Sequence, residues 1–433
     1  MKKVLIITYH WPPGAGPGVQ RFLKFCKYLM EFDWEPTILT VKDGNYPAID
    51  ESLLNDVPDG IKVYRTKTSE PYKAASFFTG KKQKDITVGL IGMKDSKSIL
   101  QKLSVFIRAN FFIPDARKGW KKYAVKKAVE LISENKIDAI ITTGPPQSTH
   151  LIGLELKKRF HLPWIADFRD PWTTVYYNKF FPRLDVTKKK DKALEDKVIA
   201  EADCITVVSE GLKEEFEERS RRIEVIYNGY DEDDVFFDTP EVTQKFLMSY
   251  IGNFKPNQNI MTLWEAMTEL INEKRDFKEN LEINLIGKVD IHTLEDIKKM
   301  GLSDNLHVID FVPHDKATKS MLKANLLLFI IPYTENNQLI LTGKIFEYLA
   351  SRTPMLSIGP TNGNASKLIT EAGRDKMIEY DDKSGIKQII VKYYNEWKKD
   401  NHIPFKHLET NLNKYTRRDL TRCLSEVLNE LIK

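Results

Sequence analysis

The sequence predicts an α/β protein built from two doubly wound, parallel-sheet domains of similar size. Three observations favour this class. Short, continuously apolar runs alternate with amphipathic helical stretches, the alternation occurs in two separate series, and an acidic, turn-rich segment near residues 230–247 divides them. Runs that are apolar throughout are typical of parallel strands, because helices cover both faces of such a sheet.

The first series begins with a strand at Val4–Thr8 and a helix whose apolar stripe runs from Val19 to Phe32. We expect further strands at 37–41, 139–142, 164–166, 204–208 and 224–227, and helices at 123–134, 147–160, 194–202 and from 211. The series ends at Asn228-Gly229-Tyr230, which is turn chemistry. The first domain is therefore placed at residues 1–235.

The second series begins after this turn and defines a domain at residues 245–411. Its expected strands are 249–251, 281–286, 306–309, 326–331 and 355–358, and its expected helices are 260–272, 291–300, 314–323 and 343–350. A last helix, from about Tyr415, carries apolar residues at helical spacing.

Composition excludes several classes of protein. With 433 residues, 42% hydrophobic and 29% charged, the chain is suited to a globular fold. Its longest apolar runs are far shorter than the roughly 20 residues that cross a bilayer. The N-terminal run is too brief for a signal peptide, so we expect a cytoplasmic protein. The three cysteines are widely spaced and indicate neither a disulfide framework nor a zinc site.

Charge is unevenly distributed. Residues 71–130 carry 14 lysines and arginines against 4 aspartates and glutamates, interleaved with phenylalanine, leucine and isoleucine. Such a stretch is suited to an anionic membrane surface, and is also compatible with a solvated helix whose apolar side is core. No nucleic-acid fingerprint occurs, so no nucleic-acid partner is expected.

Candidate binding residues follow the strands, since ligands of open parallel sheets lie beyond the carboxyl ends of the strands. The loop after the first strand contains Gly14, Gly16 and Gly18, whose backbone N–H groups could approach an anion. It lacks both the dinucleotide-binding glycine spacing and the Gly-Lys-Ser/Thr of a phosphate-binding loop. An ordinary strand-to-helix turn is the alternative.

Two further loops of the first domain carry candidate catalytic groups. In Asp167-Phe-Arg-Asp-Pro-Trp, Asp170 and Arg169 could orient a hydroxyl or accept its proton, or the motif could form an internal Asp–Arg salt bridge. His150 follows the preceding strand, where it either faces the ligand or packs on its helix.

The most informative stretch of the second domain is Thr342-Gly-Lys-Ile-Phe-Glu. Thr342 is a candidate helix cap, and Gly343 and Lys344 could receive a phosphate. Glu347 lies one turn further on the same face and could accept hydrogen bonds from a ribose diol. A capped surface helix with a Lys–Glu pair is the alternative. Asp231-Glu-Asp-Asp contains a D-x-D pattern, but its place after Asn-Gly indicates a solvated turn, so no metal site is expected.

These pieces together resemble the retaining GT-B glycosyltransferases of family 4, in particular the bacterial branch that builds surface polysaccharides. The resemblance spans nearly the whole chain. It rests on the glycine-rich first loop, Arg108-Ala-Asn with Pro114-Asp-Ala-Arg-Lys-Gly-Trp, Asp167-Phe-Arg-Asp-Pro-Trp, Val208-Ser-Glu, Asn228-Gly, Tyr250-Ile-Gly and Thr342-Gly-Lys-Ile-Phe-Glu-Tyr-Leu-Ala. It implies a GT-B fold of two Rossmann-like domains facing across a cleft, with a C-terminal helix at about 412–433 that crosses back to the first.

The resemblance also assigns roles to individual residues. Glu347 matches the second glutamate of the family's E-x7-E motif, which binds the ribose, and Thr342, Gly343 and Lys344 fall where the donor phosphates are held. The remaining assignments are Gly16 and Gly18 for the loop that closes over the donor, Arg169 for the position where many members carry a catalytic histidine, and Asp170 beside it.

Three positions depart from the family pattern. Leu339 stands where the first glutamate of E-x7-E is expected, and Gly252-Asn253 replaces the Gly-Arg of the phosphate clamp. The later lysine of that clamp has only Lys255 and Gln258 as nearby candidates. Lys288, after Gly287, is a candidate replacement for the lost cation.

The activity implied is metal-independent, hexosyl-type transfer from a nucleotide-sugar donor to a glycan or lipid-linked saccharide, with retention of configuration and no cofactor. Asp170 is the candidate to hold or deprotonate the acceptor hydroxyl. Residues 71–130 lie in the acceptor-side domain, so we expect peripheral attachment to the inner face of an anionic membrane. A nucleotide-sugar epimerase and a non-catalytic nucleotide- or membrane-binding module of the same fold are the alternatives.

Overall fold

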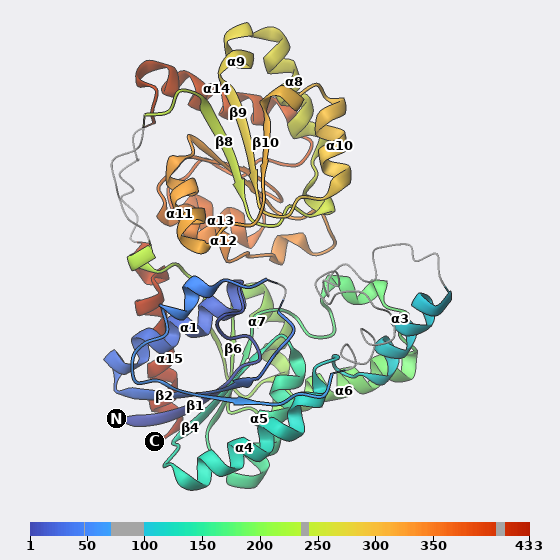
Figure 1. Ribbon diagram of the computed structural model, residues 1–433, viewed down its shortest axis with the longest axis vertical. Helices are drawn as coiled ribbons and strands as arrows, with labels where there is room; N and C mark the ends of the chain where they lie inside the picture. Colours follow the sequence, from blue (N-terminus) through green and yellow to red (C-terminus); the bar gives the residue numbers. More distant parts are fainter. Residues whose placement is uncertain (47, 71–98, 235–241, 404–411) are drawn as a thin grey trace. The chain divides into compact units, whose positions relative to one another are not determined.

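The structure is a computed structural model that describes residues 1–46, 48–70, 99–234, 242–403 and 412–433. These residues form two compact units (Figure 1). The first comprises Met1–Asn228 together with Arg417–Lys433, and the second comprises Gly229–Thr416. The division at Asn228 lies just before the linker expected near 230–247, of which residues 235–241 lie outside the described residues.

The first unit contains a seven-stranded sheet in the order β3-β2-β1-β4-β5-β6-β7, with every strand pair parallel. In β1, Leu5 and Ile7 belong to one hydrophobic cluster, whereas Val4 and Ile6 belong to another. Alternate residues of a strand point to opposite faces, so both faces of this sheet are buried. The strands are β1 (Lys2–Ile7), β2 (Trp34–Val41), β3 (Lys62–Thr66), β4 (Ala139–Gly144), β5 (Trp164–Phe168), β6 (Cys204–Val207) and β7 (Ile223–Val225).

Helices cover this sheet, and one of them comes from the C-terminal end of the chain. In Figure 1 the C-terminal helix α15 lies beside α1, and its Leu420, Leu424 and Leu428 share a hydrophobic cluster with Phe22 and Phe25 of α1. The helices of this unit are α1 (Pro17–Leu29), α3 (Ile99–Phe111), α4 (Lys121–Glu134), α5 (His150–Phe160), α6 (Asp185–Glu201), α7 (Glu210–Phe216) and α15 (Arg417–Leu431).

The second unit contains a five-stranded parallel sheet in the order β10-β9-β8-β11-β12. Its strands are β8 (Phe246–Ile251), β9 (Leu281–Ile286), β10 (Leu306–Ile309), β11 (Leu326–Ile330) and β12 (Met355–Ile358). Its helices are α8 (Met261–Glu273), α9 (Arg275–Asn280), α10 (Ile291–Lys299), α11 (His314–Lys323), α12 (Lys344–Ala350), α13 (Asn364–Glu371) and α14 (Lys383–Asp400).

The predicted fold class is confirmed, and most predicted elements form. Strands 281–286, 306–309 and 355–358 have the expected bounds. Elements that the sequence analysis missed include β3, α3 and α14. β3 is an edge strand with no buried residue, so it lacks the apolar run that marks the central strands.

Candidate functional site

The carboxyl ends of β8 and β9 meet in a stretch of bare backbone. Gly252 follows β8 and Gly287 follows β9, with φ of 114° and 120°, conformations that L side chains rarely adopt. The Gly252 N–H donates to the Ile286 carbonyl at 2.7 Å, and a Cβ on Gly287 would lie 2.7 Å from the Gly252 oxygen. Because a side chain is disfavoured at both positions, a ligand can approach this backbone closely.

Lys344, the first residue of α12, reaches the same place. Its Nζ lies 4.0 Å from the centroid of the Tyr250 ring, and a Cβ on Gly252 would lie 2.8 Å from that nitrogen. Among the described residues, no carboxylate lies within ion-pairing distance of Lys344, and the negative face of the Tyr250 ring is its main electrostatic partner. A partly buried ammonium beside open backbone is suited to binding an anion.

Tyr348 fastens α12 to β8. Its hydroxyl accepts a hydrogen bond from the Ile251 N–H at 2.9 Å, and burial raises the pKa of this phenol well above its usual value. The helix register places Glu347 on the same face as Lys344. Glu347 is partly exposed, and its carboxylate forms no hydrogen bond or ion pair with the described residues. It is therefore available to accept hydrogen bonds from hydroxyl groups of a ligand.

The other predicted donor-binding residues of the second unit are arranged differently. The predicted cap at Thr342 is wrong, because α12 begins at Lys344 with Gly343 at its N-cap and no side chain caps it. Asn253 and Lys288 are both exposed, and their carbonyls accept hydrogen bonds from the Tyr250 hydroxyl at 3.1 Å and the Phe254 N–H at 2.8 Å. Their backbones shape the loops while their side chains extend into solvent.

Gln258, one candidate for the missing clamp lysine, is a structural residue. Its side chain is buried, its Nε2 donates to the Ile330 carbonyl at 2.8 Å, and its Oε1 accepts from the Tyr250 hydroxyl at 3.1 Å. A buried amide satisfied in this way binds no phosphate. The cation beside Gly252 comes from Lys344 instead.

In the first unit, the structure brings Gly18 and Arg169 together. A Cβ on Gly18 would lie 1.4 Å from Nη1 of Arg169, and Gly18 is buried. The Arg169 side chain donates from Nε to the Gly144 carbonyl at 3.1 Å and from Nη2 to the Pro145 carbonyl. Its guanidinium therefore joins the loops that follow β1, β4 and β5. Gly16, with φ of 114°, has open space around it.

The two carboxylates of the Asp167–Asp170 motif have different environments. Asp167 is buried and pairs with Arg21 of α1 at 2.8 Å, so the cation that pairs with this carboxylate lies outside the motif. Burial alone would raise the pKa of Asp167, but the charge of Arg21 and hydrogen bonds from Arg21, Thr143 and Thr206 outweigh it and hold that pKa below its usual range. Asp170 is exposed at the end of the β5 loop.

Comparisons with known proteins agree with this architecture. Residues 82–234 match the family Glycosyltransferase Family 4. The chain is similar to sucrose-phosphate synthase from Thermosynechococcus elongatus, with a TM-score of 0.60 and 13% identity over 100% of this chain and 98% of that chain. It is also similar to S. aureus TarM, a variant of which was solved with fondaparinux, alpha-GlcNAc-glycerol and UDP, with a TM-score of 0.61 and 12% identity over 99% and 100% of the two chains.

The chain has a GT-B fold, and the match to the Glycosyltransferase Family 4 model is confined to residues 82–234. A Listeria monocytogenes protein described as a UDP-N-acetylglucosamine 2-epimerase matches with a TM-score of 0.54 and 12% identity, over 99% and 96% of the two chains. The fold is thus shared by proteins with different reactions. No curated protein matches the sequence.

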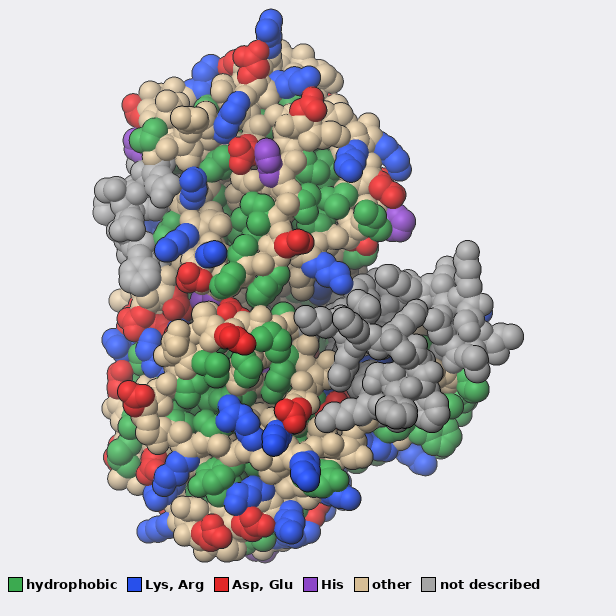
Figure 2. All heavy atoms as spheres, viewed as in Figure 1, with side chains coloured by type: hydrophobic (Ala, Val, Ile, Leu, Met, Phe, Trp, Pro, Cys, Tyr) green, Lys and Arg blue, Asp and Glu red, His purple; other side chains and the backbone are tan. Residues whose placement is uncertain are grey.

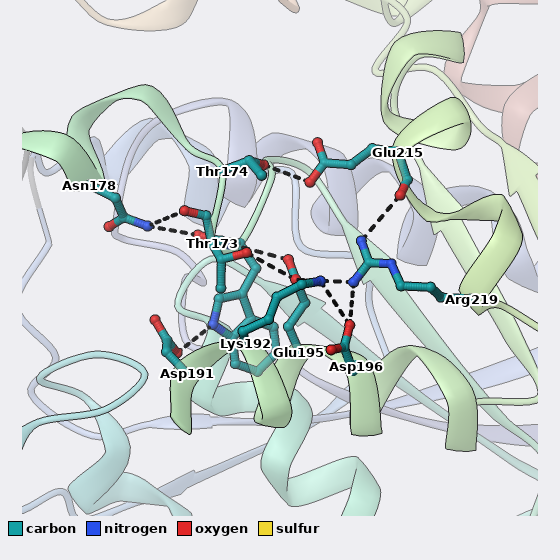
Figure 3. A network of polar contacts seen from close by, with 10 residues as sticks. Thr173, Thr174, Asn178, Asp191, Lys192, Glu195, Asp196, Glu215 and Arg219 are labelled. Carbon is teal, nitrogen blue, oxygen red and sulfur yellow. Dashed lines mark hydrogen bonds and ion pairs between the residues drawn. The ribbon is translucent and has the colours of Figure 1, made fainter. Parts of the chain in front are cut away.

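Within the first unit, a polar network holds the loop that follows Asp170 (Figure 3). Glu195 of α6 is fully buried, accepts from the Thr173 N–H at 3.2 Å and hydroxyl at 3.0 Å, and pairs with Arg219 at 3.1 Å. Asp191, one turn earlier, accepts from the Trp172 indole N–H at 2.8 Å. Neither acidic residue could be selected from the sequence, because nothing in the pattern of α6 shows that they point into the first unit.

The first unit buries His150, which resolves the two alternatives left open for it. Its ring is fully buried, stacks on Phe168 with centroids 4.4 Å apart, and contacts the Thr142 hydroxyl at 2.9 Å. Burial lowers the pKa of His150 to about 3, so it stays neutral. We therefore regard it as a packed core residue. His10, which the sequence pattern did not single out, lies after β1 and is only partly accessible to solvent. Desolvation of its ring, together with the charges of Arg169 and Arg117, holds its pKa well below the usual value.

Proposed function

We propose that this protein transfers a hexosyl-type sugar from a nucleotide-sugar donor to a glycan or lipid-linked acceptor with retention of configuration. The observation that carries the proposal is the position of Lys344, whose ammonium lies beside the bare backbone at Gly252 with Glu347 one turn further along α12. This arrangement provides a cation for a diphosphate and a carboxylate for the adjoining ribose.

The chemistry assigned to these groups is electrostatic. As the bond between sugar and diphosphate lengthens, negative charge grows on the leaving diphosphate and positive charge grows on the sugar. Lys344 and the backbone N–H groups of the glycine loops stabilise the leaving group without needing a divalent metal. Because these groups are held in place by Tyr348 and by the two strands, little reorganisation is required during the reaction.

We assign the acceptor to the first unit. Asp170 is exposed and lies beside Arg169, whose guanidinium is fixed by the Gly144 and Pro145 carbonyls. In this proposal Asp170 holds or deprotonates the acceptor hydroxyl, and the Gly16–Gly18 loop closes over the donor. The buried network around Glu195 keeps the Asp170 loop in one conformation.

The acceptor side also offers a surface for a lipid-linked substrate. Leu103, Ile107 and Phe111 of α3 are 53%, 43% and 66% exposed and lie at i, i+4 and i+8 on one helix face. On the face shown in Figure 2, lysine and arginine side chains gather over the lower part of the first unit, where α4 lies. A groove of about 650 Å³ along α4 is lined by Lys118, Lys121, Lys122, Lys126 and Arg159, together with Glu130 and Glu155.

This apolar and basic surface supports the proposed contact with anionic lipid. Residues 71–98, the other part of the basic stretch, lie outside the described residues. No helix of the described ranges has the length and apolar character to span a bilayer.

The first experiment is a thermal-shift panel of UDP, GDP, TDP, ADP, CMP and NAD. A ligand that binds the native state raises the melting temperature, so we expect at least one nucleoside diphosphate to do so. A response to NAD alone would contradict the proposal. With the responding donor, NMR of the product's anomeric centre tests retention, and activity unchanged by EDTA tests metal independence.

The epimerase alternative is kept because the Listeria protein shares the fold. Incubating the donor sugar alone separates the two reactions, since an epimerase converts it without a second substrate. A non-catalytic module of this fold would neither hydrolyse nor transfer the sugar of any donor that it binds.

A further inference from the structure

A second pocket opens at the carboxyl edge of the sheet in the second unit. Its volume is about 610 Å³, and it is formed by residues 256, 257 and 259–262 after β8, by Tyr333 after β11, and by residues 379–381. None of the groups assigned to the donor lines it, because Gly252, Gly287, Lys344 and Glu347 are all absent from its walls. The residues that line this pocket are therefore separate from those assigned to the donor.

One wall of this pocket is an exposed aromatic ring held in a fixed position. Tyr333 is 67% exposed, and its ring meets Tyr380 at 90° with centroids 5.0 Å apart. Tyr380 is anchored because its hydroxyl donates to the Ile331 carbonyl at 3.0 Å and accepts from the Asn337 amide at 3.0 Å. The Tyr333 N–H also donates to the Asn257 carbonyl at 2.6 Å. A large exposed ring fixed in this way offers an apolar platform with little entropy to lose on binding.

Polar side chains line the rest of the pocket, and their charge selects the ligand. Glu379 uses Oε1 to accept from the Thr361 N–H at 2.8 Å and from the Thr361 hydroxyl, and its Oε2 forms no hydrogen bond or ion pair with the described residues. The side chains of Asp381, Asn257 and Thr262 likewise form no hydrogen bond or ion pair with the described residues.

Among the described residues, no lysine or arginine lines this pocket, whereas the two carboxylates of Glu379 and Asp381 do. Such a surface repels phosphate and other anions, so a nucleotide is a poor ligand for it. An aromatic platform surrounded by carboxylate, amide and hydroxyl groups matches an uncharged sugar, whose C–H face packs on the ring and whose hydroxyls both donate and accept hydrogen bonds.

We propose that this pocket, centred on Tyr333, is a second saccharide-binding site that holds an uncharged glycan chain. It differs from the donor site at Lys344 in its lining and in its charge. On the proposed function, such a site would keep a growing polysaccharide attached to the enzyme between transfers, which raises the local concentration of acceptor ends.

The test is affinity electrophoresis of the full chain through gels containing dextran, yeast mannan, galactomannan or glycogen, with anionic hyaluronate as the comparison. We expect at least one neutral polysaccharide to retard the protein. Tyr333→Ala should weaken that retardation about tenfold, since it removes the aromatic platform, and Tyr333→Trp should restore it. Because Tyr333 is largely exposed, the Ala variant is expected to fold, which an unchanged melting temperature would verify.

Two controls separate this site from the donor site. Tyr333→Ala should keep its thermal shift with the nucleoside diphosphate, whereas Lys344→Ala should lose that shift but keep its retardation by polysaccharide. The saccharide site is disproved if no neutral polysaccharide retards the protein, if Tyr333→Ala is retarded as strongly as the wild type, or if hyaluronate retards it most. Loss of nucleotide binding alone would bear only on the proposed transferase activity.

Discussion

The guanidinium of Arg169 occupies the space that a side chain at Gly18 would fill, with Nη1 1.4 Å from where the Cβ would be. Gly18 lies in the first turn of α1, where alanine would otherwise be the better helix former. Glycine is therefore needed at position 18 because it leaves room for Arg169 to reach the carbonyls of Gly144 and Pro145. Gly18 and Arg169, which are distant in the sequence, are therefore in direct contact and depend on each other.

This relationship predicts a change of sign in a double-mutant cycle. Gly18→Ala should destabilise the protein by about 1–3 kcal/mol because it displaces Arg169. In an Arg169→Ala background the same substitution should be neutral, or stabilising by up to about 1 kcal/mol, because only the helix preference remains. Thermal melting of the four proteins measures this coupling. Purely additive effects would show that the two residues do not compete for space.

Lys344→Ala should raise the dissociation constant for the responding nucleoside diphosphate about tenfold to a hundredfold, since a charge-assisted contact is lost. Titration calorimetry measures the change. Lys316→Ala, an exposed lysine on α11, is the matched control and should bind as the wild type does. Lys288→Ala should have a smaller effect than Lys344→Ala, because its ammonium extends into solvent. Equal affinity of Lys344→Ala and the wild type would remove this lysine from the site.

Asp170→Asn should lower kcat by at least about a hundredfold if this carboxylate deprotonates the acceptor, while the melting temperature stays unchanged. Steady-state kinetics and a melting curve of the same preparation check both expectations. Turnover within a fewfold of the wild type would show that Asp170 has no such role.

Asp167→Asn, in contrast to Asp170→Asn, should lower the stability of the protein. It leaves the buried Arg21 without its counter-charge, which costs about 3–5 kcal/mol. The lowered pKa of Asp167 means that this stabilisation is present above its usual pKa of about 3.9 and is lost as the pH falls through the lower, native-state value. Melting curves between neutral and acid pH should therefore show the difference between wild type and variant shrinking in acid. A difference independent of pH would argue against the ion pair.

Binding to anionic lipid vesicles should depend on salt and on the basic groove of α4. Lys122→Glu with Lys126→Glu should abolish co-sedimentation at low salt, whereas Lys298→Glu with Lys299→Glu, the same charge change on exposed residues of α10, should not. Raising the ionic strength from 0.1 M to 1 M shortens the screening length from about 10 Å to about 3 Å, so wild-type binding should fall. Equal binding at both salt concentrations, or no binding, would contradict the electrostatic part of the proposal.

The sequence was sufficient for the fold class and for most of the elements because its signals are local. The apolar runs of β1 and β11, the helical stripe of α1 and the turn at Asn228-Gly229 each follow from a few neighbouring residues. Lys344 and Glu347 could be selected for the same reason, since a helix of known register places them on one face. Gly252 and Gly287 were visible as strand-ending glycines, although their contact was not.

Side-chain partners that are distant in sequence were decided only by tertiary structure. The motif at Asp167 could not show that its first carboxylate pairs with Arg21, or that Arg169 packs against Gly18. In the second unit, the sequence could not show that Gln258, a candidate for the phosphate-binding lysine position, is buried. The sequence determined which backbone elements form, because propensity and periodicity act between near neighbours. Which charges are buried, paired or open to a ligand depends on packing between segments, and no local pattern encodes it.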